Sequence, residues 1–93
     1  MSYPAGLVVL SREGCHLCER MLEELAVFER EGRIPPVTVL DVDSKADWAR
    51  QYGLKVPVLL LDGSAICHYT LNSQELLRLM APRMATAAAI LPR

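Results

Sequence analysis

The sequence has little excess charge, few aromatic residues and no long apolar run. Its 93 residues carry a net charge of −1, which gives no electrostatic case for binding nucleic acid or an anionic membrane. The apolar runs are too short to span a bilayer, and residues 1–6 lack the basic and apolar regions of a signal peptide. Three cysteines are an odd number, so we expect no disulfide framework and a reducing cytoplasm as the compartment.

The sequence also lacks internal repeats, a linker, a glycine-rich phosphate loop and a serine triad. A chain of this length can bury one core, and the 52% of residues that are hydrophobic can supply it. We therefore expect residues 1–93 to form a single domain. Within it, the alanine-rich stretch 82–93 is expected to be either helical or a loose tail.

Two cysteines, Cys15 and Cys18, stand out because they follow an apolar run and open a helical pattern. This spacing at a strand-to-helix junction is typical of thiol redox sites. At a helix N-terminus, unpaired N–H groups and the helix dipole favour the thiolate, which is the nucleophilic form. We predict that Cys15 attacks a disulfide and that Cys18, about one helical turn further on, resolves the mixed disulfide.

Apolar runs that alternate with helical periodicity predict an α/β fold with the element order βαβαββα. The expected strands are 7–11, 37–42, 58–61 and 65–69, and the expected helices are 15–31, 44–52 and 72–81. The first helix implies that the first two strands are parallel, and Asp62-Gly63 is a strong hairpin signal. Ser44 with Asp47 resembles a capping box, and Pro82 is expected to end or kink the last helix.

This order and the Cys-His-Leu-Cys motif at residues 15–18 together resemble the thioredoxin fold, and glutaredoxins most closely. The resemblance covers about residues 7–81 and includes Val56-Pro57 before the third strand. Short bacterial glutaredoxin-like proteins carry this same motif. The resemblance implies a four-stranded mixed sheet flanked by helices, catalysis by the two motif cysteines without a cofactor, and a cis Val56–Pro57 bond that helps position the substrate.

Two further residues beside the motif are candidates for tuning Cys15. His16 either stabilises the thiolate as an imidazolium or is an exposed residue of the first helical turn. Arg12 stands where glutaredoxins commonly carry a basic residue, three positions before the first cysteine. It either attracts a thiolate or a substrate carboxylate, or is an ordinary surface arginine.

The chain departs from glutaredoxins after the fourth strand, where they usually have paired glycines and this chain has Cys67-His68. Glycines let a backbone approach glutathione closely, and a β-carbon at each position obstructs that approach. We therefore expect glutathione to be a poor specific ligand. We also expect Cys67 to be a small buried hydrophobic residue rather than a third redox partner.

These features together predict a cytoplasmic thiol–disulfide oxidoreductase that reduces a protein or small-molecule disulfide. Its own reductant would be thioredoxin reductase or the glutathione system. The alternative is a non-enzymatic module that binds a metal or an iron–sulfur cluster, or a redox sensor that changes its partner. A metal site needs about four ligands. Cys67 and His68 point to opposite faces of a strand, so they cannot both join the two motif cysteines.

Overall fold

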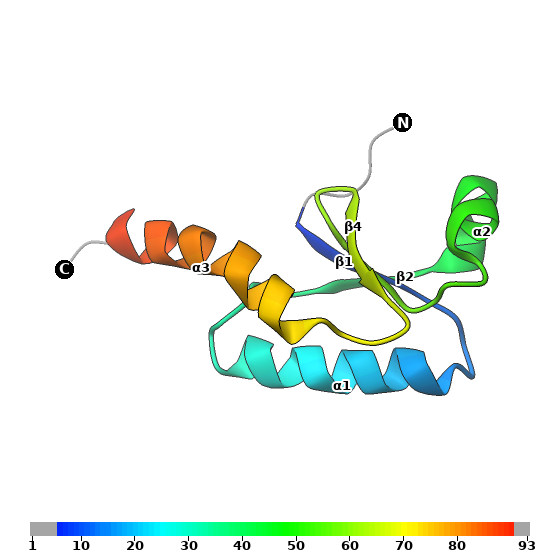
Figure 1. Cartoon of the computed structure of the whole chain (residues 1–93), viewed down its shortest axis with the longest axis horizontal. Helices are drawn as coiled ribbons and strands as arrows, with labels where there is room; N and C mark the ends of the chain where they lie inside the picture. The colour runs from blue at the N-terminus through cyan, green and yellow to red at the C-terminus, as the bar shows by residue number, and fades with distance from the viewer. Residues whose placement is uncertain (1–5, 91–93) are drawn as a thin grey trace.

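The computed structural model describes residues 6–90 of the chain, and their side chains as far as residue 84 (Figure 1). The expectations for residues 1–5 and for the last three residues of the 82–93 tail lie outside the described residues. The elements are β1 Leu7–Ser11, α1 His16–Arg30, β2 Thr38–Asp41, the short 3-10 helix η1 Val42–Ser44, α2 Ala46–Tyr52, β3 Val58–Leu61, β4 Ser64–His68 and α3 Ser73–Ile90.

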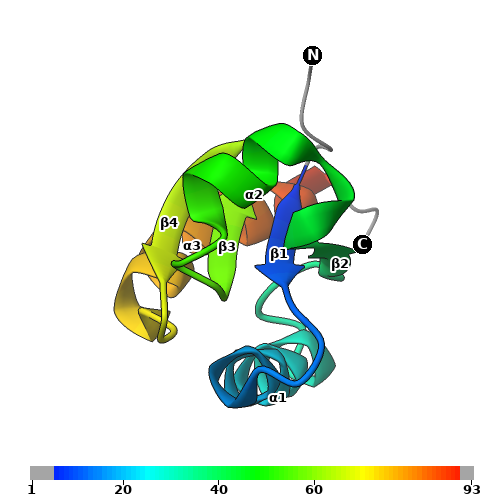
Figure 2. The ribbon, with the colours of Figure 1, turned by 90° about the vertical axis from the view of Figure 1, so that its right-hand side faces the viewer.

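The four strands form one mixed sheet in the order β2-β1-β3-β4. β1 is parallel to β2, and β3 is antiparallel to both β1 and β4. Figure 2 shows α1 and α2 on opposite sides of this sheet. The structure confirms the α/β fold with a four-stranded mixed sheet flanked by helices. None of the described helices combines the length and the apolar composition that crossing a membrane requires.

The central strands are apolar along their whole length because helices cover both faces of the sheet. Alternate residues of β1 therefore enter different cores: Leu7 and Val9 pack with α1 and α3, and Val8 and Leu10 pack with α2. The first core consists of Leu7, Val9, Met21, Leu25, Ile34, Leu59, Leu76 and Met80. The second consists of Val8, Leu10, Val42, Trp48, Val58 and Leu60. These cores hold β1 and α1, the two elements on either side of the cysteine motif, in place.

The predicted hairpin is confirmed, with Leu61 paired to Ser64 across a two-residue turn. Both turn residues have positive φ, 51° at Asp62 and 88° at Gly63, as the tightest hairpin turns require. The Asp62 carboxylate also accepts the N–H of Gly6 at 2.6 Å and a guanidinium hydrogen of Arg83 at 2.9 Å. These two bonds, the first more than the second, lower the pKa of Asp62.

The predicted capping box at Ser44 is wrong. The Ser44 hydroxyl donates to the Asp41 carbonyl at 2.6 Å inside η1, and α2 begins after Lys45 with no side-chain cap, so no capping box forms. Of the two alternatives for Pro82, an end of the helix is wrong, because α3 continues to Ile90, and the helical alternative for the stretch that follows agrees with the structure as far as that residue. The alanines that follow Pro82 are strong helix formers, which favours continuation of the helix beyond it. The predicted start of this helix is confirmed, because the Glu75 N–H donates to Asn72 Oδ1 at 3.1 Å.

Candidate active site

The motif cysteines lie where β1 passes into α1. Gly14 has a φ of 78° and turns the chain, and Cys15 then occupies the N-cap position with φ −94° and ψ 110°. The sulfur of Cys15 accepts the backbone N–H of Cys18 at 3.2 Å, as a serine or aspartate oxygen does in an ordinary cap. One N–H group at the N-terminus of α1 therefore binds this sulfur. This environment favours negative charge on Cys15 once the pair is reduced.

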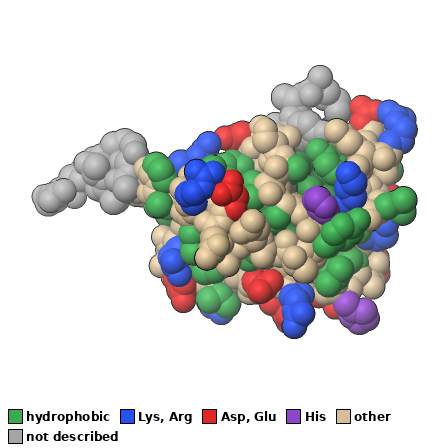
Figure 3. Space-filling view, in the orientation of Figure 1, with side chains coloured by type: hydrophobic (Ala, Val, Ile, Leu, Met, Phe, Trp, Pro, Cys, Tyr) green, Lys and Arg blue, Asp and Glu red, His purple; other side chains and the backbone are tan. Residues whose placement is uncertain are grey.

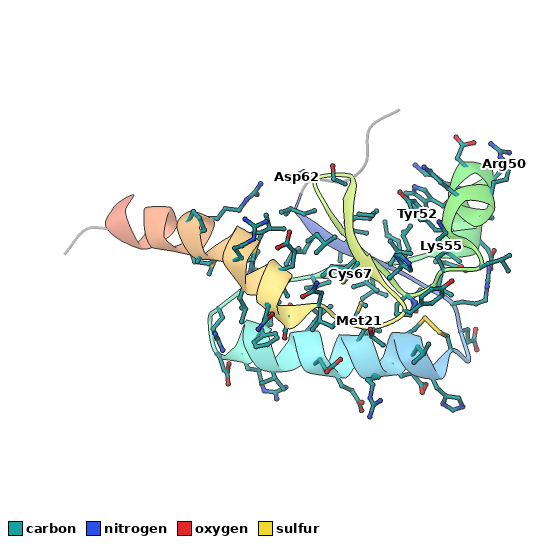
Figure 4. The ribbon with its side chains drawn as sticks, in the orientation of Figure 1. Met21, Arg50, Tyr52, Lys55, Asp62 and Cys67 are labelled. Carbon is teal, nitrogen blue, oxygen red and sulfur yellow. A yellow bond between two sulfur atoms is a disulfide. The ribbon has the colours of Figure 1, made fainter. Side chains whose placement is uncertain are left out.

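The sulfurs of Cys15 and Cys18 are joined in a disulfide, with Cα atoms 5.2 Å apart (Figure 4). The two residues differ in exposure. Cys15 is partly exposed, whereas Cys18, in the first turn of α1, is 1% exposed. A molecule in solution can therefore reach Cys15, while Cys18 is reached through Cys15.

The His16 side chain is 98% exposed, and its Nδ1 lies 3.6 Å from Glu19 Oε1. The charged group nearest to the imidazole in the structure is thus the Glu19 carboxylate, one turn further along α1. Of the two alternatives for this residue, its position agrees with the exposed residue of the first helical turn.

Arg12 is bound within the fold through all three guanidinium nitrogens. Nε and Nη2 donate to the Asp43 carboxylate at 2.9 and 3.0 Å, and Nη1 donates to the Gly53 carbonyl at 2.8 Å. The Asp43 hydrogen bonds raise the pKa of Arg12, and the same bonds lower the pKa of Asp43. The Arg12 carbonyl also accepts the Cys15 N–H at 3.3 Å. Arg12 therefore connects the motif loop to η1 and to the end of α2.

Val56 and Pro57 lie at the same end of the sheet as the motif. Leu10 pairs with Val58, so the chain after β1 and the chain before β3 are neighbours. The Val56–Pro57 bond is cis, and the Pro57 carbonyl accepts the Tyr69 N–H at 2.9 Å. Within the described part of the chain, neither backbone group of Val56 has a hydrogen-bond partner. An extended segment approaching the motif can therefore pair with Val56.

Sequence reasoning missed two contributors to this site. Asp43 is not among the predicted site residues, yet its carboxylate holds Arg12. The parallel register of Ser11 with Asp41 places the ends of β1 and β2 together, and this register is the signal that identifies the pair. Tyr69 was expected to end the last strand but lies beyond it, and its hydroxyl donates to the Leu54 carbonyl at 3.1 Å.

Cys67 lies in β4, packs against the first core and is partly exposed. Burial raises the pKa of its thiol, and a hydrogen bond from the Asn72 backbone acts in the opposite direction. His68 is exposed and lies edge-on to the Tyr69 ring, with ring centroids 4.8 Å apart. Among the described residues, no three histidine, cysteine or acidic side chains gather closely enough to hold a metal ion.

The fold also occurs in known proteins. The protein Ne2328 of Nitrosomonas europaea is 34% identical, with a TM-score of 0.73 over 86% of this chain and 95% of its own. The protein XcR50 of X. campestris is 27% identical, with a TM-score of 0.64 over 83% of this chain and 97% of its own. The holo form of glutaredoxin C1 from populus tremula x tremuloides is 22% identical, with a TM-score of 0.54 over 90% of this chain and 86% of its own. This likeness shows the shared fold.

No curated protein matches the chain. Residues 6–81 match the family model described as Glutaredoxin-like domain (DUF836). This match spans β1 to the middle of α3 and includes the Cys15–Cys18 pair. Family and cysteine pair together support a thiol redox function. The chain therefore belongs to the glutaredoxin-like domain family (DUF836).

Proposed function

We propose that this protein is a cytoplasmic thiol–disulfide oxidoreductase that reduces disulfides by dithiol exchange. The observation that carries the proposal is the unequal pair at the start of α1. Cys15 is partly exposed at the helix N-terminus, and Cys18 is 1% exposed one turn behind it. An exposed sulfur stabilised by helix N–H groups suits attack, and a covered neighbour suits resolution.

The exchange proceeds in two balanced steps. The Cys15 thiolate attacks one sulfur of the substrate disulfide, which forms a mixed disulfide and expels the other substrate sulfur as a thiolate that takes up a proton. The Cys18 thiolate then attacks Cys15 Sγ, which forms the Cys15–Cys18 disulfide and releases the second substrate thiol. Two electrons pass to the substrate, and no cofactor takes part. A dithiol from the thioredoxin reductase system, or glutathione, returns the pair to its reduced form.

Val56 would hold the substrate during these steps. Its N–H and C=O are available for an extended backbone, and they lie at the end of the sheet from which the motif loop emerges. Hydrogen bonds to both groups align the substrate cysteine with Cys15, which lowers the entropic cost of the first attack.

Serine variants of the two cysteines test the mechanism. Cys15→Ser removes the attacking thiolate, so reduction of a small disulfide in the presence of a reductase system is lost. Cys18→Ser retains the first attack but cannot resolve it, so a covalent mixed disulfide accumulates and is detected as a mass increase by mass spectrometry without reductant.

A metal or iron–sulfur module gives a different outcome. Both variants then lose metal and stability together, because metal binding is coupled to folding. Equal loss of stability in both variants, with no adduct from Cys18→Ser, would contradict the redox proposal. Metal content of the wild type after anaerobic purification serves as the independent control.

A further inference from the structure

Leu54 is 92% exposed, the largest exposed fraction among the large hydrophobic side chains that the structure describes. A single exposed leucine is ordinary on a protein surface and is not by itself a site. The backbone around Leu54, however, is tightly held. Arg12 Nη1 donates to the Gly53 carbonyl at 2.8 Å, Tyr69 Oη donates to the Leu54 carbonyl at 3.1 Å, and the Lys55 N–H donates to the Tyr52 carbonyl at 2.8 Å.

Three successive residues, 53 to 55, are thus held by two bonds from distant parts of the chain and by one local turn bond. The Leu54 side chain points to solvent, and the hydrogen bonds restrict the backbone of the loop that carries it. A preordered apolar group binds a partner more tightly than a mobile one, because the ordering cost is already met by folding. A rigid exposed leucine is therefore suited to contact another molecule.

The Leu54 loop is adjacent to the motif because Arg12 contacts both. The Arg12 carbonyl accepts the Cys15 N–H, and the Arg12 guanidinium binds Gly53. Leu17 lies inside the motif and is 41% exposed, and Tyr69 is 44% exposed and bonded to both Leu54 and Pro57. Figure 3 shows hydrophobic side chains gathered between the loop after α2 and the N-terminal end of α1, with a basic side chain beside them.

Tyr69 has a φ of 68°, in the left-handed region that a tyrosine rarely adopts. Such a conformation costs free energy and persists only where the surroundings hold it. Here the N–H bonds to Pro57 and the hydroxyl bonds to Leu54, so the residue ties the end of β4 to the loop before β3. Tyr69 is a positioning residue for Leu54.

Lys55 gives this surface a charge. It follows Leu54 directly and is exposed, and in the described part of the chain no carboxylate lies within ion-pairing distance of its ammonium. Figure 4 places Lys55 in the loop after α2. An unpaired cation beside an apolar patch complements a segment that carries an apolar and an acidic side chain together.

We propose that Leu17, Leu54 and Tyr69, here called the apolar rim, bind an apolar side chain next to the reactive cysteine of a polypeptide disulfide, and that Lys55 binds an acidic side chain of the same segment. The inference rests on the proposed redox function and names its substrate class. The apolar rim includes Leu17 of the motif itself, and Arg12 joins the Leu54 loop to Cys15, the more exposed of the two motif cysteines, so a polypeptide joined to Cys15 would lie beside the rim.

Disulfide-linked dimers of three short peptides test the proposal. In the three peptides the two residues before the cysteine are Glu-Leu, Lys-Leu or Gly-Gly. Hydroxyethyl disulfide serves as the small substrate without a peptide. For the wild type we expect kcat/KM to be about tenfold higher for the Glu-Leu peptide than for the Gly-Gly peptide, a ratio that corresponds to about 1.4 kcal/mol. Leu54→Ser should remove this preference. Val39→Ser, which removes a 50% exposed valine from the distant edge strand β2, should retain it.

Reversing the charge of Lys55 gives a second, independent test of the same proposal. Lys55→Glu should invert the preference between the Glu-Leu and Lys-Leu peptides, and added salt should weaken the preference in both proteins. Tyr69→Phe should reduce the selectivity for the Leu-containing peptides, because Leu54 loses the bond that holds its carbonyl. These effects are measured as ratios of kcat/KM, so a general loss of folding does not imitate them.

The outcomes separate the two proposals. If the wild type reduces hydroxyethyl disulfide but treats all three peptides alike, the apolar rim is not a specificity site while the redox function stands. If no disulfide is reduced, both proposals fail. If Leu54→Ser converts a dimer to a monomer in light scattering and leaves peptide ratios unchanged, the surface joins two copies of the chain and the proposal is overturned.

Discussion

At the scale of single residues, the pairing of Arg12 with Asp43 determines how the site is built. The guanidinium is bidentate on the carboxylate, but both side chains are open to solvent, 40% and 51% exposed. Exposed pairs contribute little to stability on their own. The significance of this pair is geometric, since it holds the Arg12 side chain where Nη1 reaches Gly53 and its backbone where the carbonyl reaches Cys15.

The variant Asp43→Asn should show this pairing in the pH dependence of stability. The hydrogen bond from Arg12 lowers the pKa of Asp43 in the folded protein. The carboxylate therefore stabilises the fold fully above its unfolded pKa of about 4, and this contribution is lost as pH falls through the lower folded value. Urea denaturation should find the variant less stable at pH 7, with a difference that shrinks below about pH 4.

Glu24→Gln is the matched control, because it removes one negative charge from an exposed position of α1 that takes part in no ion pair among the described residues. A stability difference for Asp43→Asn that stays constant down to the lowest pH at which the protein folds would show that this carboxylate does not titrate as described. A loss at pH 7 that is equal in both variants would assign it to net charge instead of pairing.

At the scale of elements, local patterns predicted those features whose cause is local. The apolar run at 7–11 became β1 with its bounds unchanged, because a strand buried on both faces needs continuous apolar sequence. Asp62-Gly63 formed the hairpin turn because few other residue pairs accept positive φ twice. The cysteine pair was found the same way, since its spacing and its position at a helix start are both visible in the sequence.

Features with a tertiary cause were not visible in this way. The conformation of Tyr69 depends on the Leu54 and Pro57 carbonyls, which are distant in sequence. The Ser44 hydroxyl turned to Asp41 because the 3-10 turn η1 brought that carbonyl within reach, which no capping pattern contains. The helix does not end at Pro82 because a proline is only a local signal, while the residues on both sides of it favour the helix.

The variant Pro82→Ala tests this interpretation of α3. Proline in a helix interior lacks the N–H that would bond to the carbonyl four residues earlier, and alanine restores it. The substitution should raise the free energy of unfolding by about 1–3 kcal/mol and increase the circular dichroism signal at 222 nm. Ala81→Gly should lower it by about 1 kcal/mol. Lower stability of Pro82→Ala would mean that contacts of the proline ring outweigh the missing bond.

At the scale of the whole molecule, the sheet separates two ends with different roles. One end holds the motif, Arg12 and the Val56–Pro57 loop. These segments lie together because the end of β1 pairs with the start of β3. The other end is closed by the hairpin, where Asp62 bonds to Gly6 and Arg83. The backbone of Val56, which has no hydrogen-bond partner among the described residues, and the partly exposed Cys15 both lie at the first end. A disulfide is therefore expected to enter from that end.

Of the two candidate reductants, the glutathione system should serve this end less well than the thioredoxin reductase system. Cys67 packs against the first core and His68 against the Tyr69 ring, so their β-carbons stand on fixed backbone where glutaredoxins carry glycines. Coupled assays run in parallel should show faster turnover with the thioredoxin reductase system than with glutathione and its reductase. The double variant Cys67→Gly/His68→Gly should gain glutathione-dependent turnover by about tenfold, corresponding to about 1.4 kcal/mol. Cys67→Ala/His68→Ala, which keeps both β-carbons, should not. Efficient glutathione turnover by the wild type, or equal gains in both double variants, would show that these side chains do not exclude the tripeptide.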